Sequence, residues 1–449
     1  MKKILTLLFF LILTNDLLAN ELELDYKVFS LDGKINNVPV FNSNSPEIIK
    51  TDGILLSTFP PDNMLYPNAH LNYSFKGEFD IFSHHISKQE DNDKDLYQAI
   101  LIKNPNDKEV KIKIKSSASY VSQPDSPFIK LEKLKDNFDG NIYSGPGDRV
   151  AQDIIRNKNF LKRTYTIKPN EYLLLFEKKI NTSDLEPPYI NGRSTLIKLY
   201  SSDNIYVADL ALFEKKFLGF KLKPNLQDWI NILEKGNLAE KRDKIPSPLD
   251  TVLPKGTPFI YGRVAGVQIG NEWFGILKND FLNLNIPEKG KSFAYVLNTL
   301  YNNTLSTGQN QNAKLVRRYK DTAYQAHANY GVNYNIRIPL YNNTNQEQRI
   351  YISFDSPIRI PENIRNVDKL KFNLMPPDKI NFRGELKLEY ELNNKRIIDY
   401  VHIVQRFTEK GEPILKLILK PYEKKVIDIS YIYPADCTPP HVLSISNIE

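Results

Sequence analysis

The sequence predicts a mainly β protein with two immunoglobulin-like β-sandwich units joined by a short helix and a linker. Segments 96–114 and 334–354 both alternate apolar and polar residues on either side of an Asn-rich turn. A period of two is typical of a half-buried strand, so each segment is interpreted as a β-hairpin. The order strand, Pro-containing turn, strand at 165–175 recurs at 417–427. The two halves of the sequence therefore match in two places, which indicates two related units.

The N-terminus predicts export. In residues 1–19, two lysines precede the apolar run 4–13, and Ala19 is a small residue suitable for cleavage. The run is shorter than the roughly 20 residues of a membrane span, and no later segment is comparably apolar. We expect a signal peptide over 1–19 and a mature chain without a transmembrane segment. An uncleaved membrane anchor is the alternative.

The remaining sequence divides into four predicted parts. Residues 20–70 are rich in Asn, Ser and Pro and lack helical periodicity, so they predict an extended segment laid over a domain. Residues 71–220 consist almost entirely of strand and turn patterns and form the first predicted sandwich. Residues 221–256 form the connection, and residues 257–449 form the second sandwich with its leading strands.

One segment departs from the β pattern. Between 224 and 236, three apolar residues recur at i, i+4 and i+7, which is typical of one face of an α-helix. Asn225 is a suitable N-cap and Gly236 a suitable C-terminal stop. The charged, proline-broken residues that follow resemble a linker. We therefore place the boundary between the two units within 221–256.

Composition limits the possible functions. The chain has 449 residues, of which 41% are hydrophobic, enough to fill the cores of two or three domains. Its only cysteine, Cys437, excludes an intramolecular disulfide, and we expect it to be buried. The net charge of +7 comes from 60 basic and 53 acidic residues spread along the chain. Nucleic-acid binding needs a concentrated basic stripe, so no nucleic-acid partner is expected.

The candidate partner-binding residues are two arginines and two histidines. The glycine motif 144–149 is suited either to an anion-binding nest that includes Arg149 or to a tight turn between strands. Arg193 lies in a second predicted turn, and we hypothesise that both arginines face one anionic partner. His84 and His85 end a strand-like run, so their side chains point to opposite faces and cannot readily chelate one metal.

Patterns for catalysis and cofactors are incomplete. The sequence contains no usable serine elbow, Ser-x-x-Lys pair or Cys near a His, and it lacks a P-loop. Residues 91–95 begin like a calcium loop, but the glycine and the final carboxylate of an EF-hand are missing. We predict no catalytic residue, cofactor or metal site. A glycosidase carboxylate pair is neither supported nor excluded among the 53 acidic residues.

Several short sequence segments together resemble those of a family of secreted cyanobacterial proteins of unknown function, and they are spread over nearly the whole mature chain. The segments are 41–47, 57–61, 79–85, 145–149, 191–196, 327–332 and 433–436. The resemblance implies a cyanobacterial envelope or extracellular location. It supplies no activity, cofactor or catalytic residue.

We therefore predict an exported protein of the periplasm, outer surface or extracellular space. It is interpreted as a non-enzymatic binding or structural module that recognises an envelope polysaccharide or a surface protein. The 25 tyrosines and 23 phenylalanines suit sugar stacking, although they suit β cores equally well. A periplasmic polysaccharide-acting hydrolase with loop-borne carboxylates is the alternative, and a purely architectural spacer is a third.

Overall fold

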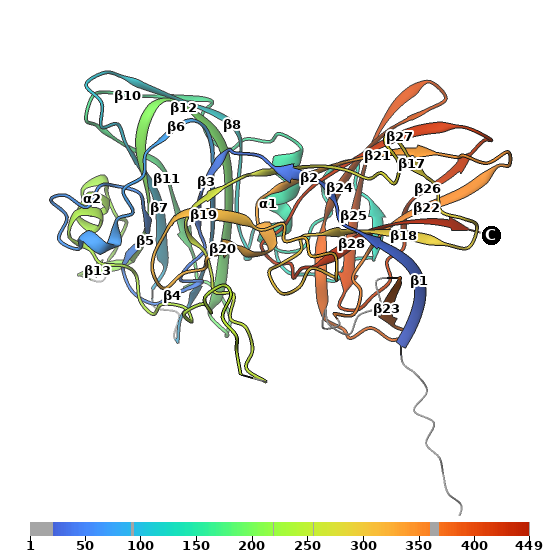
Figure 1. Cartoon of the computed structure of the whole chain (residues 1–449). Helices are drawn as coiled ribbons and strands as arrows, with labels where there is room; N and C mark the ends of the chain where they lie inside the picture. The colour runs from blue at the N-terminus through green and yellow to red at the C-terminus, as the bar shows by residue number, and fades with distance from the viewer. Residues whose placement is uncertain (1–20, 91–93, 219, 255, 360–367, 449) are drawn as a thin grey trace, which may run out of the picture.

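The computed structural model describes residues 21–90, 94–218, 220–254, 256–359 and 368–448. It confirms a mainly β protein, with 50% of residues in strands and 6% in helices. The strands gather into two halves, here called half A and half B, with helix α1 (Pro146–Ile155) between them (Figure 1). The predicted signal peptide lies outside the described residues. No helix in the described part of the chain is long and apolar enough to cross a membrane.

Half A contains the sheet that runs in the order β10-β8-β12-β6-β3-β15-β19-β20. The long strand β12 continues beyond this sheet, and its C-terminal part pairs with β5 and β7, while β11 pairs with β7. Apolar side chains of β7 and β8 meet in one core between these layers. The bounds are β3 (Pro39–Ser43), β4 (Ile48–Ile49), β5 (Gly53–Ser57), β6 (Phe75–Lys88), β7 (Leu96–Lys103), β8 (Val110–Val121), β10 (Thr164–Ile167), β11 (Tyr172–Ile180), β12 (Ile190–Phe213), β15 (Ala265–Ile269), β19 (Ala313–Arg318) and β20 (Gln325–Ala326).

Half B packs two sheets, in the orders β23-β1-β18-β28-β22-β26 and β2-β16-β21-β27-β24-β25-β9, around a second core. Strand β17 also pairs with β21. The bounds are β1 (Glu21–Phe29), β2 (Asp32–Ile35), β9 (Leu134–Asp136), β16 (Glu272–Ile276), β17 (Leu284–Asn285), β18 (Ser292–Leu297), β21 (Asn333–Tyr341), β22 (Gln348–Asp355), β23 (Lys369–Asn373), β24 (Ile380–Leu392), β25 (Lys395–Arg406), β26 (Pro413–Leu419), β27 (Lys424–Ile432) and β28 (His441–Ile448).

The remaining elements are short. The hairpin of β13 and β14 and helix α2 lie on half A. Two short 3-10 helices, η1 and η2, lie in loops. Their bounds are β13 (Lys215–Phe217), β14 (Phe220–Leu222), α2 (Leu226–Lys235), η1 (Pro67–Ala69) and η2 (His327–Asn329).

The hairpin interpretation of segments 96–114 and 334–354 is wrong. Within the described residues, β7 pairs with β11 and β12, whereas β8 pairs with β10 and β12. In half B, β21 pairs with β27 and β22 pairs with β26 and β28. Each segment therefore crosses from one sheet to the other at a corner. Period-two alternation predicts a strand but does not say which neighbour it pairs with.

A buried asparagine holds each corner. Asn104 lies fully buried at the end of β7, and its Nδ2 is 2.7, 3.0 and 2.9 Å from the carbonyl oxygens of Lys108, Ile167 and Lys168. Its Oδ1 accepts a hydrogen bond from the backbone N–H of Asn106 at 2.9 Å. One side chain thus ties the corner to the turn between β10 and β11.

Half B repeats this arrangement. The Nδ2 of buried Asn342 lies 2.7, 3.1 and 2.8 Å from the carbonyl oxygens of Gln346, Leu419 and Lys420. The strand order β10-β8-β12-β6-β3 also corresponds to β26-β22-β28-β18-β1, and β3–β6 and β1–β18 are both parallel pairs. The two halves are therefore related in structure. Immunoglobulin-like sandwiches are not established, because that fold is built from antiparallel sheets.

Strand pairings cross the domain boundaries suggested by the sequence. Segment 20–70 contributes β1 and β2 to half B and β3 to half A, and segment 257–449 sends β15, β19 and β20 into half A. Strand β9, from segment 71–220, pairs with β25 of half B. Such pairing depends on residues far apart in sequence, as in Glu21 opposite Asn373.

The helix predicted at 224–236 is confirmed, but its position differs from the expectation. The Asn225 side chain accepts hydrogen bonds from the backbone N–H groups of Gln227 and Asp228, which caps α2. Trp229 and Leu233 are buried against half A. Helix α2 lies on the outer side of half A, whereas α1 occupies the place between the halves (Figure 1).

Replacing Asn342 with alanine tests the corner. Three backbone carbonyl oxygens lose a donor in a buried site, so we expect the free energy of unfolding to fall by about 2–3 kcal/mol. The measurement is urea unfolding followed by circular dichroism. Asn343→Ala is the control, because Asn343 is the exposed neighbour. Equal stability of the two variants would contradict the structural role of the corner.

Candidate ligand-binding cleft between the two halves

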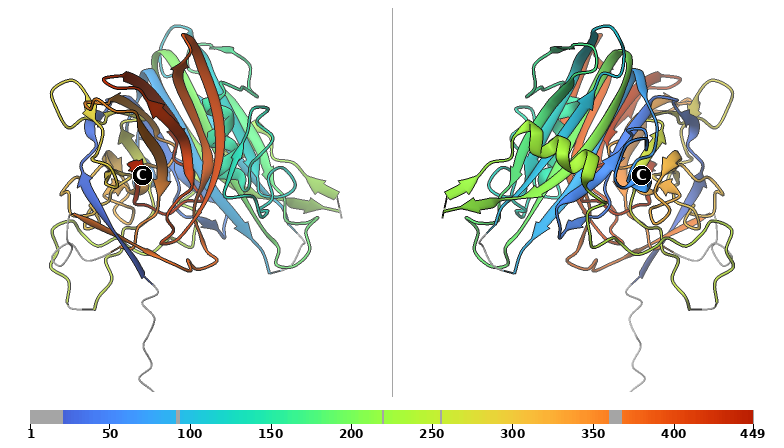
Figure 2. Two further views of the ribbon diagram at one scale, coloured as in Figure 1. Left: turned by 90° about the vertical axis from the view of Figure 1, so that its right-hand side faces the viewer. Right: turned by 90° about the vertical axis from the view of Figure 1, so that its left-hand side faces the viewer.

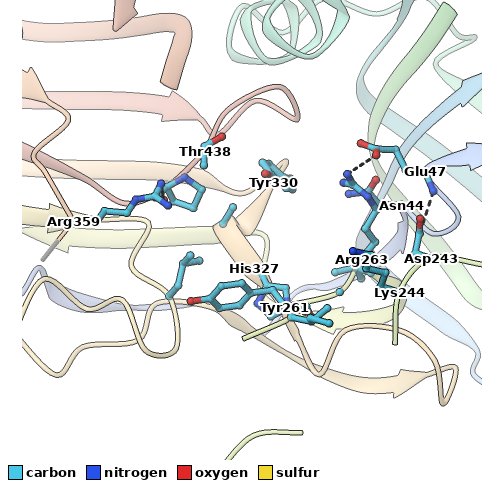
Figure 3. A pocket seen from close by; sticks show the side chains of 16 residues that line it. Asn44, Glu47, Asp243, Lys244, Tyr261, Arg263, His327, Tyr330, Arg359 and Thr438 are labelled. Atoms are coloured by element: carbon cyan, nitrogen blue, oxygen red, sulfur yellow. Dashed lines mark hydrogen bonds and ion pairs between the residues drawn. The ribbon is translucent and has the colours of Figure 1, made fainter. Parts of the chain in front are cut away.

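A cleft opens where the two halves meet. Figure 3 shows one of its hollows, of about 480 Å³, with side chains entering from both halves. A neighbouring hollow of about 600 Å³ shares four lining residues with it. The shared residues are Glu47, Arg263, Tyr330 and Thr438. The two hollows thus lie side by side and are separated by a small group of polar side chains.

Half A contributes an ion pair to the cleft. Glu47 lies in the loop between β3 and β4, and Arg263 lies just before β15, which pairs antiparallel with β3. The hydrogen bond from Asn44 N to Val264 O, 2.8 Å long, extends this pairing toward the loop. The Arg263 guanidinium consequently meets the Glu47 carboxylate (Figure 3). Burial raises the pKa of Glu47, and the positive charge of Arg263 opposes this rise.

Aromatic side chains from several loops also line the cleft. The Tyr330 hydroxyl donates to the backbone oxygen of Cys437 at 2.8 Å, and its ring stacks on Tyr433 with centroids 5.7 Å apart. The ring of Tyr261 lies edge-on to His327 at 4.8 Å. Burial lowers the pKa of His327 to about 4, so its imidazole is neutral near neutral pH. These contacts hold flat surfaces in fixed positions along the cleft.

Two further arginines line the cleft without a carboxylate partner. Among the described residues, no carboxylate lies within ion-pair distance of Arg359 or Arg383. Arg359 donates from Nη2 to the backbone oxygen of Pro439. The Arg383 Nη1 donates to Ser144 Oγ at 3.3 Å and its guanidinium lies 5.0 Å from the centre of the Phe128 ring, while its Nε has no hydrogen-bond partner. Both side chains keep unused donors for an anionic group.

A third charged element is the N-terminus of α1. The backbone N–H of Gly147 donates to Asp436 Oδ2 at 3.0 Å, so a carboxylate from half B caps the helix. A Cβ atom on Gly147 would lie 2.7 Å from that oxygen, which explains the glycine. Burial raises the pKa of Asp436 to about 6, although Arg383 opposes the rise.

The structure resolves the alternatives for motif 144–149. The motif is neither a tight turn between strands nor an open anion site, because α1 begins within it and Asp436 occupies its amide. Arg149 stacks on the rings of Tyr120 and Tyr143, 3.9 and 4.5 Å from their centres, and donates to the backbone oxygen of Asp125. Its guanidinium is thus held by the chain itself.

Arg193 is not available to a partner together with Arg149. It is only 5% exposed, and it donates to Ser119 Oγ at 3.1 Å and to Lys179 O at 2.7 Å. Burial lowers its pKa to about 10. Ser119 and Tyr120 are successive residues of β8, so the two arginines approach opposite faces of this strand.

The two histidines point to opposite faces, as predicted. His84 lines the larger hollow, where its Nδ1 lies 2.8 Å from Ser194 Oγ and burial lowers its pKa to about 3. His85 is fully buried inside half A, with Ser43 Oγ at 2.9 Å and Pro46 O at 2.8 Å. Of the four predicted residues, all of which are described, His84 alone lines the cleft.

Metal binding finds no support in the described part of the chain, where no three His, Cys, Asp or Glu residues are grouped to hold an ion. Residues 91–93 of the calcium-like loop lie outside the described residues. Cys437 is buried, as expected, and its Sγ lies 3.4 Å from the backbone nitrogen of Arg383. Burial raises the pKa of this thiol.

Sequence reasoning missed the charged residues that converge on the cleft. Five of them are Glu47, Arg263, Arg359, Arg383 and Asp436. Two of them, Glu47 and Asp436, lie in the sequence segments 41–47 and 433–436 that carry the family resemblance. The other three carry no local pattern, because Arg263 and Arg359 lie in loops and Arg383 lies within β24 among ordinary neighbours.

Comparison with known proteins gives a family without a known activity. A family model described as "Protein of unknown function (DUF3370)" matches residues 26–447. Among curated proteins, none matches the chain. The match confirms the expected membership of a family of unknown function. Secretion and a cyanobacterial source stay predictions.

Asp436 makes the stability of the protein depend on pH. Its pKa is about 6 when folded, above the ordinary 3.8, so the folded protein holds this proton more tightly than the unfolded chain. This group therefore favours folding at low pH, and its contribution is lost as the pH rises from 3.8 toward 6. Asp436→Asn has no such proton to lose. We expect the stability of the variant, relative to the natural protein, to increase over this range and to level off above it.

The measurement is urea unfolding of both proteins at pH values from about 4 to about 7. The difference between their free energies of unfolding isolates Asp436 from the other titrating groups. A difference that does not change with pH would contradict the burial of the ionised carboxylate.

Proposed function

The chain belongs to the DUF3370 family of proteins of unknown function, and from this premise we propose that it is an exported binding protein that holds an anionic polysaccharide. The binding site is the cleft between halves A and B. The observation that carries the proposal is the convergence of Arg359 and Arg383 on this cleft without a carboxylate partner among the described residues. Arginine presents a planar fork of donors that matches a carboxylate or sulfate group.

The lining also suits sugar rings. Tyr261 and Tyr330 line the smaller hollow, and Phe128 lies at the larger one beside Arg383. An aromatic ring offers an apolar face to the C–H side of a sugar, while the arginines and Glu47 offer hydrogen bonds to its substituents. This alternation of flat apolar and charged groups distinguishes the cleft from an ordinary apolar pocket.

The length of the cleft favours a polymer over a small molecule. A further hollow of about 380 Å³ is lined by Arg383 and Arg406, and Arg383 also lines the hollow of about 600 Å³. In the described residues, three neighbouring hollows are thus linked by shared side chains, and each falls in the usual range for one small ligand. A succession of such hollows matches successive units of a chain.

The location is part of the proposal. The predicted signal peptide over 1–19 supports export to the periplasm, the outer surface or the extracellular space, where acidic polysaccharides are accessible. A surface protein with a flexible acidic segment is the competing partner, and its segment would use the same arginines.

Substituting the cleft arginines tests the site. We expect the natural protein to bind an oligogalacturonate more tightly than a neutral cello-oligosaccharide of equal length. Arg359→Gln and Arg383→Gln each remove a charged donor, so each should weaken oligogalacturonate binding roughly 10- to 100-fold. The measurement is isothermal titration calorimetry at low salt.

Arg349→Gln is the matched control, because Arg349 is an exposed arginine on β22 that does not line the cleft. Equal binding by all variants, or equal binding of acidic and neutral oligosaccharides, would contradict the proposed site. Retained binding of an acidic peptide alone would favour the protein partner.

A hydrolase is the second candidate, and one observation favours it. Glu47 and Asp436 line the same hollow from loops of opposite halves, and burial raises the pKa of both. A carboxyl group with a raised pKa is suited to act as a general acid. Under this alternative the protein releases new reducing ends from the oligosaccharide, and Glu47→Gln and Asp436→Asn both abolish release. Binding without release in the natural protein would exclude it for that substrate.

A further inference from the structure

A two-stranded hairpin projects from half A, away from the cleft. Strands β13 and β14 pair antiparallel, with Lys216 opposite Lys221 and Lys215 opposite Leu222. Figure 2 shows the hairpin in both views as a pair of green arrows that extends beyond the body of the protein. Three large apolar side chains described on it are strongly exposed: Leu218 by 82%, Phe220 by 73% and Leu222 by 47%.

Buried carboxylates anchor the base of the hairpin. Lys221 Nζ lies 3.0 Å from Glu214 Oε2 and 3.6 Å from Asp95 Oδ2. Lys223, just after β14, lies 2.8 Å from Glu177 Oε1. All three carboxylates are nearly inaccessible to solvent, and Glu177 lies in β11 while Asp95 directly precedes β7, so the ion pairs tie the base of the hairpin to half A.

The anchoring orients the two faces. Successive residues of a strand point to opposite faces, so Phe220 and Leu222 point away from the face of Lys221. Because Lys221 reaches toward the body, the apolar side chains are directed outward.

Cationic side chains flank the apolar tip. Lys215 and Lys216 are exposed, and no carboxylate of the described residues lies within ion-pair distance of either. We propose that this hairpin docks the protein on an anionic lipid surface. Leu218, Phe220 and Leu222 enter the boundary between headgroups and acyl chains, and Lys215, which lies opposite Leu222 and shares its face, binds a lipid phosphate.

The size and shape of the hairpin favour lipid over a protein partner. Stable protein interfaces bury well over roughly 1,000 Å² with complementary surfaces, whereas the two short strands of this projection offer a small area. Interfacial membrane binding needs only shallow insertion together with a few basic residues. The inference is independent of the proposed polysaccharide site, because the hairpin and the cleft share no residue.

The test is sedimentation with lipid vesicles. Residues 20–449 are used so that the apolar run 4–13 does not partition into lipid by itself. We expect binding to phosphatidylglycerol vesicles and little binding to phosphatidylcholine vesicles, with affinity that falls as salt increases.

Leu218→Ser combined with Phe220→Ser should weaken binding at least roughly tenfold. Lys215→Gln should weaken it by roughly fivefold, and Lys216→Gln, on the face of Lys221, should weaken it less.

Phe281→Ser is the matched control, because Phe281 is 90% exposed on a loop of half B. Unchanged thermal unfolding of all variants shows that the fold is intact. The proposal is overturned if the natural protein ignores both vesicle types, binds both equally, or loses binding equally in the control. It is also overturned if the hairpin variants abolish self-association in the absence of lipid and leave vesicle binding unchanged.

Discussion

The position of α1 between the two halves is the constraint on which the cleft depends. Its Asp148 accepts a hydrogen bond from His402 Nε2 at 2.7 Å, and its following residue Arg156 binds Glu385 with two nitrogens at 2.7 and 2.8 Å. Asp148, His402 and Glu385 are almost completely buried. The ion pair of Arg156 and Glu385 stabilises only when both partners are present, because loss of one partner leaves an uncompensated charge. The pairs therefore hold half B at one distance from the helix.

The opposite face of α1 is apolar. Val150, Ala151 and Ile154 pack with Leu196 and Phe82 of half A. A helix of 10 residues is marginal in isolation, so these two faces rather than helix propensity keep α1 formed. The same helix directs its N-terminus at Asp436, which links the packing between the halves to the charges of the cleft.

The halves are also joined through their sheets. β1 and β2 cross into half B, and β15, β19 and β20 return to half A, so neither half is one continuous segment. The asparagine corners make each half rigid in the same way. A cleft built between two interleaved halves is largely pre-formed, which limits the entropy lost when a ligand binds. Burial then decides the role of each charged residue: Arg193 donates to the chain inside half A, whereas Arg383 lines the cleft.

The sequence by itself determined the properties that arise from neighbouring residues. The period of two predicted strands, the Asn225 cap and helical spacing predicted α2, and the alternation of strand faces separated His84 from His85. A lone cysteine predicted burial of Cys437. These properties depend on backbone geometry over a few residues, and the local pattern carries them.

Only the tertiary structure decided which strands pair, and hence that segments 96–114 and 334–354 are corners rather than hairpins. It also decided that motif 144–149 begins a helix capped by Asp436, nearly 290 residues away in sequence. The convergence of Arg263, Arg359 and Arg383 follows from pairings between distant strands. Hydrogen bonds, burial and electrostatic fields act through space, so a local sequence pattern contains no record of them.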